Sequence, residues 1–169
     1  MKDTLSIINQ MQADGVIDHY AIAGAVGATF YLEPAATFDI DILVVLPNLP
    51  DSSLLTLSPL YTYLSHRGCR VEREHIVIGN WPVQFLPAGD DLEKNALTEA
   101  VPTEVEGVRT WVLSAEYLVA LALRTGRLKD RTRILEFLER GAVDRQRLRD
   151  ILSCHGLLSA WEHFERRYL

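Results

Sequence analysis

Apolar positions along the chain recur at two spacings, which alternate between helix-like and strand-like segments. Helical spacing of apolar residues predicts helices over residues 4–11, 25–32, 54–66, 90–100, 114–123, 129–139, 144–154 and 157–168. Short β-branched or aromatic runs predict strands over residues 20–23, 39–46, 70–78, 82–86 and 108–113. The order of these segments predicts an α/β (α+β) fold, in which a mixed sheet flanked by helices precedes a helical C-terminal extension.

Turn and capping residues divide this pattern further. Gly24 permits a sharp turn after the first strand, and Gly79-Asn80 suits a two-residue hairpin. Ser114 is a favourable N-cap for the first helix of the all-helical part. We therefore expect an α/β core over residues 1–113 and a helical extension, packed on that core, over residues 114–169.

Two aspartates one residue apart, Asp39 and Asp41, open the most apolar run of the chain. Successive strand side chains point to opposite faces, so the two carboxylates share a face, with their Cα atoms about 6.6 Å apart. At that spacing both carboxylates can reach one or two hard cations. Without a cation they would repel each other and lose hydration, which favours a metal site. The alternative is a pair of solvated acids at the exposed end of a strand.

The composition is that of a globular chain, which we expect to be soluble and cytoplasmic. Its 169 residues suffice for one domain, or a domain with a helical appendage, and 48% of them are hydrophobic. The first six residues lack the features of a signal peptide, and no apolar run in the sequence is long enough to span a bilayer. Cys69 and Cys154 lack metal-ligand spacing, so we expect reduced thiols.

The net charge of −6 is unevenly distributed. Residues 1–113 contain 6 Lys and Arg against 15 Asp and Glu, a net of −9, whereas residues 114–169 contain 11 against 8, a net of +3. An acidic body with a basic helical end suits a metal site on one side and a phosphate-bearing ligand on the other. Solvated, Arg-rich amphipathic helices explain this distribution equally well. No dense run of Lys and Arg indicates binding of duplex nucleic acid.

The aspartate pair belongs to a longer motif that resembles the nucleotidyltransferase superfamily related to DNA polymerase β. That superfamily has a hydrophobic residue, Gly, then Gly or Ser, and further on an apolar-flanked Asp-x-Asp. Here the motif is Ala23-Gly24-Ala25, followed by Asp39-Ile40-Asp41-Ile42. The branch that it resembles most is that of the minimal and toxin-type bacterial nucleotidyltransferases. The same branch is similar to this chain over residues 20–24, 36–41, 82–87, 116–121 and 126–131, so the resemblance covers most of residues 1–140.

The resemblance implies transfer of a nucleotide from a nucleoside triphosphate to a hydroxyl of RNA, protein or a small molecule. It implies Mg²⁺ or Mn²⁺ as the cofactor, held by Asp39 and Asp41, which would neutralise the triphosphate and activate the hydroxyl. Gly24 and Ala25 would form the phosphate-binding turn, where backbone amides and a helix N-terminus approach the phosphates.

Two positions depart from the superfamily pattern. Ala25 stands where Gly or Ser is usual, so any phosphate contact there must come from the backbone. Gln84 stands on the strand that normally carries a third catalytic carboxylate, and its amide oxygen can coordinate a hard cation but is a poor general base. Glu72 and Glu74 share a face of the neighbouring predicted strand and are an alternative base. Such an alternating pair is more often the solvent face of an edge strand.

Arg127, Lys129 and Asp130 lie between two predicted helices, where the two cations would bind a triphosphate or an acceptor backbone. Their alternative role is structural, because Asp130 near a helix start and Arg127 near a helix end both complement the helix dipole. The histidines show no ligand spacing and are assigned to the surface or to helix ends; they are His19, His66, His75, His155 and His163.

Three functions compete. The leading one is a Mg²⁺-dependent nucleotidyltransferase that acts on a nucleoside triphosphate and an RNA, protein or small-molecule acceptor, away from any membrane. The chief rival is a non-catalytic binding module, such as an antitoxin or regulator, in which Gln84 marks a decayed site and the helical end binds a partner protein or a second copy. A metal-dependent phosphohydrolase is disfavoured, because no histidine joins the aspartate pair.

Overall fold

A computed structural model describes residues 1–34, 36–47 and 56–169 of the chain. Its helices are α1 (Lys2–Ala13), α2 (Gly24–Ala28), α3 (Ser58–His66), α4 (Asp91–Thr98), α5 (Ala115–Thr125), α6 (Leu128–Glu139), α7 (Arg145–Cys154) and α8 (Leu158–Tyr168). Its strands are β1 (His19–Ile22), β2 (Ile40–Val45), β3 (Arg70–Glu72), β4 (His75–Ile78), β5 (Trp81–Pro87), β6 (Val101–Val105) and β7 (Val108–Val112). As predicted, every element after residue 114 is helical.

The strands of the described residues form one mixed sheet in the order β3-β4-β5-β2-β1-β7-β6. The central strand β2 pairs parallel with β5 and antiparallel with β1, and β1 pairs parallel with β7. The antiparallel pairs β3–β4, β4–β5 and β6–β7 extend the two edges. β2 can be central because its run Ile42-Leu43-Val44 is buried on both faces. This architecture confirms the predicted fold class.

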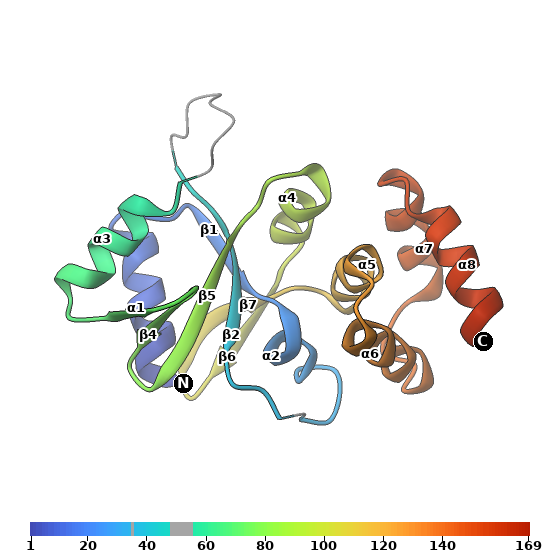
Figure 1. The fold of residues 1–169 in the computed structure, drawn as a ribbon, viewed down its shortest axis with the longest axis horizontal. Coiled ribbons are helices and arrows are strands. Elements are labelled where there is room, and N and C mark those ends of the chain that lie inside the picture. Colours follow the sequence, from blue (N-terminus) through green and yellow to red (C-terminus); the bar gives the residue numbers. More distant parts are fainter. Residues whose placement is uncertain (35, 48–55) are drawn as a thin grey trace.

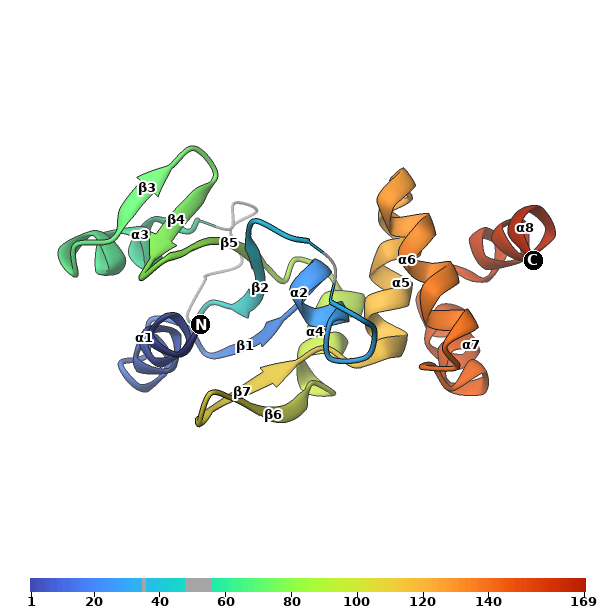
Figure 2. The same cartoon turned by 90° about the horizontal axis from the view of Figure 1, so that it is seen from below.

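The side chains of β2 divide between two apolar layers. Ile40, Ile42 and Val44 are buried with residues of α1 and α3 on one face of the sheet. Leu43 belongs to the cluster on the other face, which continues through α4 to α8. Figures 1 and 2 show this arrangement, with α1 and α3 on one side and α5 to α8 on the other. Asp41 alternates with the isoleucines, so it lies on the face of the sheet that is turned toward α5 and α6.

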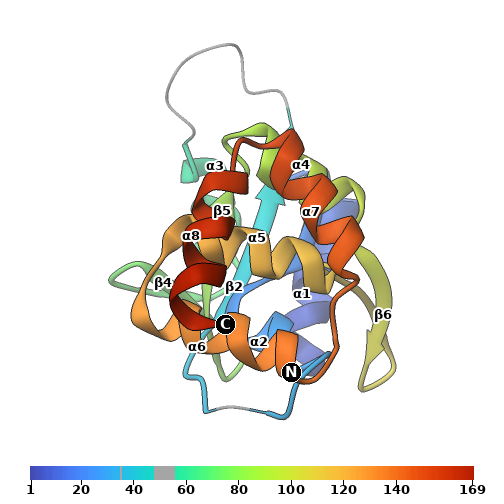
Figure 3. The same ribbon diagram turned by 90° about the vertical axis from the view of Figure 1, so that its right-hand side faces the viewer.

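The C-terminal helices cover this second face. The starts of α5 and α7 are capped: the side chains of Ser114 and Asp144 accept hydrogen bonds from backbone amides of these two helices. Figure 3 shows α5, α7 and α8 in front of the sheet. Trp161 and Phe164 of α8 stack with ring centroids 5.7 Å apart, within the same apolar cluster as Leu43. The division of the chain at residue 113 stays a prediction.

The single strand predicted over residues 70–78 is a hairpin instead. β3 and β4 pair antiparallel, and the turn between them is Arg73-Glu74, with Arg73 at a φ of +60°. The prediction that Glu72 and Glu74 share one face of a strand is therefore wrong. The sequence of this turn lacks the Gly or Asn that usually marks such a backbone conformation.

The other differences concern the ends of elements and one edge strand. The helix predicted over 25–32 ends at Ala28, and the one predicted over 54–66 begins at Ser58, with residues 54 and 55 outside the described range. β6 escapes the prediction because Pro102 is unusual in a strand, but it lies at the sheet edge, where proline is tolerated. None of the helices in the described ranges combines the length and the apolar character that crossing a bilayer requires.

Candidate functional site

The two aspartates lie at the start of the central strand. β2 carries Asp41, and Asp39 comes one residue before it. Both are partly exposed, whereas Ile40 between them is fully buried. Alternation therefore places the two carboxylates on the face opposite to Ile40, as the sequence predicts. They are also near enough for the charge of Asp39 to act on Asp41.

Gly24 lies directly against the Asp41 carboxylate. Its φ is +58°, a left-handed conformation that favours glycine, and a β-carbon at this position would clash with Oδ2 of Asp41. The amide of Ala23 donates to the carbonyl oxygen of Asp41 at 2.9 Å, which ties the turn to β2. Ala25 follows, half-buried, in the first turn of α2. The glycine turn and the aspartates of the motif thus meet in space.

Gln84 of β5 is the strand neighbour of Asp41. The parallel pairing of β2 and β5 sets Asp41 opposite Gln84, and paired residues of neighbouring strands have side chains on the same face. Gln84 is half-buried. The structure therefore brings this amide beside the aspartates, at the position that the superfamily resemblance assigns to a third carboxylate.

Asp39 has a partner that the sequence reasoning misses. His75 Nε2, at the start of β4, lies 3.1 Å from Asp39 Oδ2. The Thr37 hydroxyl donates to the other carboxylate oxygen, Oδ1, at 3.3 Å. The assignment of His75 to the surface or to a helix end is therefore wrong, because the β3–β4 hairpin carries it to the aspartates. The expectation that no histidine joins the aspartate pair, which counted against a phosphohydrolase, is wrong for the same reason. The His75 side chain is only 23% exposed.

Cations at the start of α6 act on Asp41 through their charge. Burial and the charge of Asp39 raise the pKa of Asp41 above its ordinary value, while Lys129, Arg127 and Arg133 act to lower it. The net rise means that burial and repulsion outweigh the three cations. Arg127 and Lys129 are thus brought to the site as the resemblance implies, and Arg133 joins them.

Asp130 has a structural position within this segment. It is 1% exposed, and its Oδ2 accepts hydrogen bonds from the backbone amide of Arg127 at 3.2 Å and from the Arg127 Nε at 2.7 Å. The first of these bonds satisfies the backbone amide of Arg127, the N-cap residue of α6, from the side chain three residues further on. Asp130 therefore holds Arg127 in place, which agrees with the structural alternative for this residue.

The donor set at the aspartates fits a hard divalent cation. Asp39 and Asp41 supply carboxylate oxygens and Gln84 an amide oxygen, and burial and then the charge of Asp39 raise the pKa of Asp41, both of which a bound cation would offset. Within residues 1–34, 36–47 and 56–169, no group of three or more His, Cys, Asp and Glu side chains is placed to hold a metal. Mg²⁺ often uses one or two protein carboxylates and completes its shell with substrate phosphates and water.

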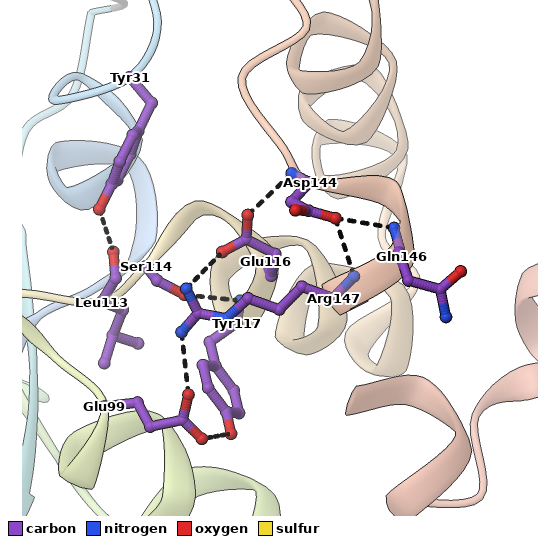
Figure 4. Close-up of polar contacts among 9 residues, drawn as sticks. All are labelled: Tyr31, Glu99, Leu113, Ser114, Glu116, Tyr117, Asp144, Gln146 and Arg147. Atoms are coloured by element: carbon purple, nitrogen blue, oxygen red, sulfur yellow. Dashed lines mark hydrogen bonds and ion pairs between the residues drawn. The ribbon is translucent and has the colours of Figure 1, made fainter. Parts of the chain in front are cut away.

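A polar network anchors α5, the helix that precedes Arg127, Lys129 and Arg133. Arg147 of α7 donates to Glu99 at 2.9 Å and lies 3.9 Å from the buried Glu116 of α5 (Figure 4). The Tyr117 hydroxyl donates to Glu99 at 2.7 Å, and the Asp144 amide donates to Glu116 at 2.9 Å. These contacts join α4, α5 and α7, and they fix the helical part from which α6 reaches the aspartates.

Two residues near the aspartates, His75 and Arg133, are not among the candidates predicted from the sequence. His75 is 36 residues from Asp39, and nothing in the residues around it indicates the contact. Arg133 could have been found from Lys129, because residues four apart lie on the same face of a helix. Arg133 can be found in this way only when the start of α6 is known.

Comparison with known proteins identifies the fold. No family model and no curated protein matches the chain. An antigenic nucleotidyltransferase-like protein from Paracoccidioides brasiliensis is similar in structure, with a TM-score of 0.54, 17% identity, and coverage of 94% of this chain and 90% of that one. The antibiotic-resistance factor ANT(2'')-Ia is similar with a TM-score of 0.53, 14% identity and coverage of 97% of each chain. At such identities the likeness establishes the fold alone, and this chain has the fold of the nucleotidyltransferases.

Proposed function

We propose that this chain is a divalent-metal-dependent nucleotidyltransferase, which moves a nucleotide from a nucleoside triphosphate to an acceptor hydroxyl. The main support for the proposal is that three segments, far apart in the sequence, come together at Asp41. Gly24 lies against its carboxylate, Gln84 pairs with it across the sheet, and the cations of α6 act on its pKa. A fold by itself allows many functions, so the proposal depends on this site.

Each group has a defined part in the proposed reaction. Asp39, Asp41 and the Gln84 amide would hold Mg²⁺ or Mn²⁺, which supplies charge neutralisation of the triphosphate and activation of the acceptor hydroxyl. Gly24 and Ala25 would present backbone amides to the phosphate oxygens, and the glycine leaves space for the Asp41 carboxylate beside them. Arg127, Lys129 and Arg133 would pair with phosphate charge.

Lys129 is the best placed of the cations to bind a triphosphate. Arg127 is already bonded to Asp130, and Arg133 Nη1 lies 3.9 Å from the same carboxylate. Among the described residues Lys129 forms no ion pair with a carboxylate, and its side chain is exposed. A free, solvated ammonium close to Asp41 can reorient toward an incoming phosphate at little cost.

One observation favours a second function, a non-catalytic nucleotide-binding module. Gln84 cannot accept a proton, and it stands where the resemblance expects a carboxylate. In this alternative the metal and the triphosphate bind, but no nucleotide is transferred, and the protein acts through a partner. Binding and transfer must therefore be measured separately.

Two measurements on the same set of variants test the proposal. The melting temperature of the wild type is recorded with Mg²⁺ or Mn²⁺ and each nucleoside triphosphate in turn, because a ligand that binds the native state stabilises it. Transfer is then measured with α-phosphate-labelled triphosphates offered to total RNA, cell protein and a panel of small hydroxyl compounds. The matched pair of variants is Asp41→Asn at the site and Glu104→Gln on β6.

If the chain is a nucleotidyltransferase, metal and triphosphate should raise the melting temperature of the wild type and of Glu104→Gln, and both proteins should transfer nucleotide. Asp41→Asn should show neither effect. Stabilisation without transfer to any acceptor class supports the binding module instead. A metal-dependent shift of the same size in Asp41→Asn would overturn both, because no function centred on the Asp41 carboxylate could survive it.

A further inference from the structure

A cavity of about 260 Å³ lies among α5, α6 and α8, in the helical part of the molecule. Its walls are mainly apolar and include Ile134 of α6 and Phe164 of α8. Phe164 is held rigidly, because it stacks on Trp161 and its ring centroid lies 5.0 Å from that of Tyr168. An apolar cavity with a fixed aromatic wall favours a ligand with an apolar body.

The polar groups of the same cavity are cationic or aromatic: Arg131, His163, Arg167 and Tyr168. Arg131 Nη1 donates to the Tyr168 hydroxyl at 3.2 Å, and the Arg167 guanidinium lies 5.5 Å from the centre of the Tyr168 ring. In the described part of the chain, neither arginine forms an ion pair with a carboxylate, in contrast to Arg127 and Arg147. Two guanidinium groups thus contact one tyrosine, and neither is paired with a carboxylate of the described residues.

The cavity is separate from the aspartate site, although α6 borders both. Lys129 and Arg133 of α6 act on Asp41, whereas Arg131 and Ile134 line the cavity. At 3.6 residues per turn, Arg131 is rotated by about 160–200° from Lys129 and Arg133 around the helix axis. The arginine of the cavity therefore points away from the face of α6 that meets the aspartates.

We propose that this cavity binds a small organic carboxylate with an aromatic or branched aliphatic body. The apolar walls would take the body, and the planar guanidinium forks of Arg131 and Arg167 match the two oxygens of a carboxylate. The volume is slightly below that of typical drug-sized pockets, which start at about 300 Å³, so a compact ligand fits better than a polymer. This proposal does not depend on the nucleotidyltransferase activity.

Calorimetric titration of the full chain with three probes tests the ligand class. The probes are naphthalene-2-carboxylate, its neutral carboxamide, and acetate, which has the charge without the apolar body. We expect the naphthalene carboxylate to bind, and the carboxamide and acetate to bind at least about tenfold more weakly, since each lacks one of the two contacts. Mg²⁺ with a nucleoside triphosphate should not displace it.

Variants of the cavity then locate the binding. Arg131→Ala and Arg167→Ala should each weaken binding by about 10- to 100-fold, the loss of a charge-assisted hydrogen bond. Ala160→Leu should weaken it by filling the cavity without a change of charge. Arg166→Ala is the matched control, because Arg166 is an exposed neighbour of Arg167 on α8 and does not line the cavity. Melting curves verify that each variant is folded.

Three results would overturn the proposal. The first is no heat of binding with naphthalene carboxylate at millimolar concentrations. The second is equal affinity of the wild type and the three cavity variants. The third is displacement by the nucleoside triphosphate with Mg²⁺, which would assign the anion to the aspartate site. None of these outcomes bears on transfer activity, which the Asp41→Asn comparison decides separately.

Discussion

Gly24 and Asp41 are in contact although they are 17 positions apart in the chain, because β1 and β2 are antiparallel neighbours and α2 begins where β1 ends. The glycine has no β-carbon, and the Asp41 carboxylate occupies the space that one would fill. Two requirements therefore coincide at residue 24, a left-handed backbone and an absent side chain. They can be separated by comparison with Gly15, which has a φ of +73° and open space around it.

Gly24→Ala should be more destabilising than Gly15→Ala. A left-handed backbone conformation costs a non-glycine residue about 1–2 kcal/mol, so both variants should lose this much stability. Overpacking against Asp41 should cost Gly24→Ala about 1–3 kcal/mol more. Urea unfolding of both variants measures the difference. Equal losses of stability would show that the Asp41 carboxylate moves aside without cost, and would contradict a tight contact between residue 24 and this carboxylate.

Asp41→Asn should have opposite effects on stability without and with a divalent cation. The pKa of Asp41 is raised, so its charge is unfavourable in the folded protein, and the neutral amide should raise the melting temperature in metal-free buffer. Saturating Mg²⁺, at a hundred times its Kd, should stabilise the wild type by about 2.7 kcal/mol. Asp41→Asn and Asp39→Asn should lose this gain, and Glu104→Gln should retain it. Calorimetry with equal Mg²⁺ affinity in the wild type and the double aspartate variant would refute the metal site.

Gln84→Asp should increase nucleotide transfer, because it restores a carboxylate beside Asp41. A positioned general base typically contributes about 10²-fold or more to rate. Gln84→Asn is the matched control, since Asn has the shape of Asp without its charge. The gain should vanish when Asp41→Asn is added. A wild type already as active as Gln84→Asp would mean that the reaction does not need a base at this position.

Glu99→Gln should lower the melting temperature at pH 7 and have progressively less effect in acid. Hydrogen bonds from Tyr117 and Arg147 hold the pKa of Glu99 below its ordinary 4.5. The stabilisation by the ionised carboxylate is therefore present above pH 4.5 and is lost as the pH falls through the lower, folded pKa. Melting curves between neutral and acidic pH measure it, with Glu104→Gln as the control. A difference that stays constant over this range would mean that packing, and not charge, is what Glu99 contributes.

The sequence predicts well whatever depends on a few neighbouring residues. The shared face of Asp39 and Asp41 follows from the period of a strand, and the helix start after Ser114 follows from its capping hydroxyl. The position of Gln84 came from the superfamily resemblance and is matched by the strand register, which pairs it with Asp41. The role of these residues in metal binding stays a prediction.

Edge strands and turns are harder to predict from the sequence, because strand pairing can override the local conformational preferences of their residues. β6 contains Pro102 and two charged or polar neighbours, and only its antiparallel partner β7 makes it a strand. The turn at Arg73 adopts a positive φ that its side chain disfavours, and the pairing of β3 with β4 compensates for it.

The amino-acid sequence by itself determined the order of the helices, the central strands β1, β2, β5 and β7, and the common face of the aspartate pair, since these follow from the spacing of neighbouring residues. Only the tertiary structure decided what surrounds that pair. His75 reaches Asp39 through a hairpin, and Lys129 approaches Asp41 through the packing of α6. Such contacts join residues 36 or more positions apart. They depend on strand pairing and helix packing across the whole chain, which no local pattern of residues encodes.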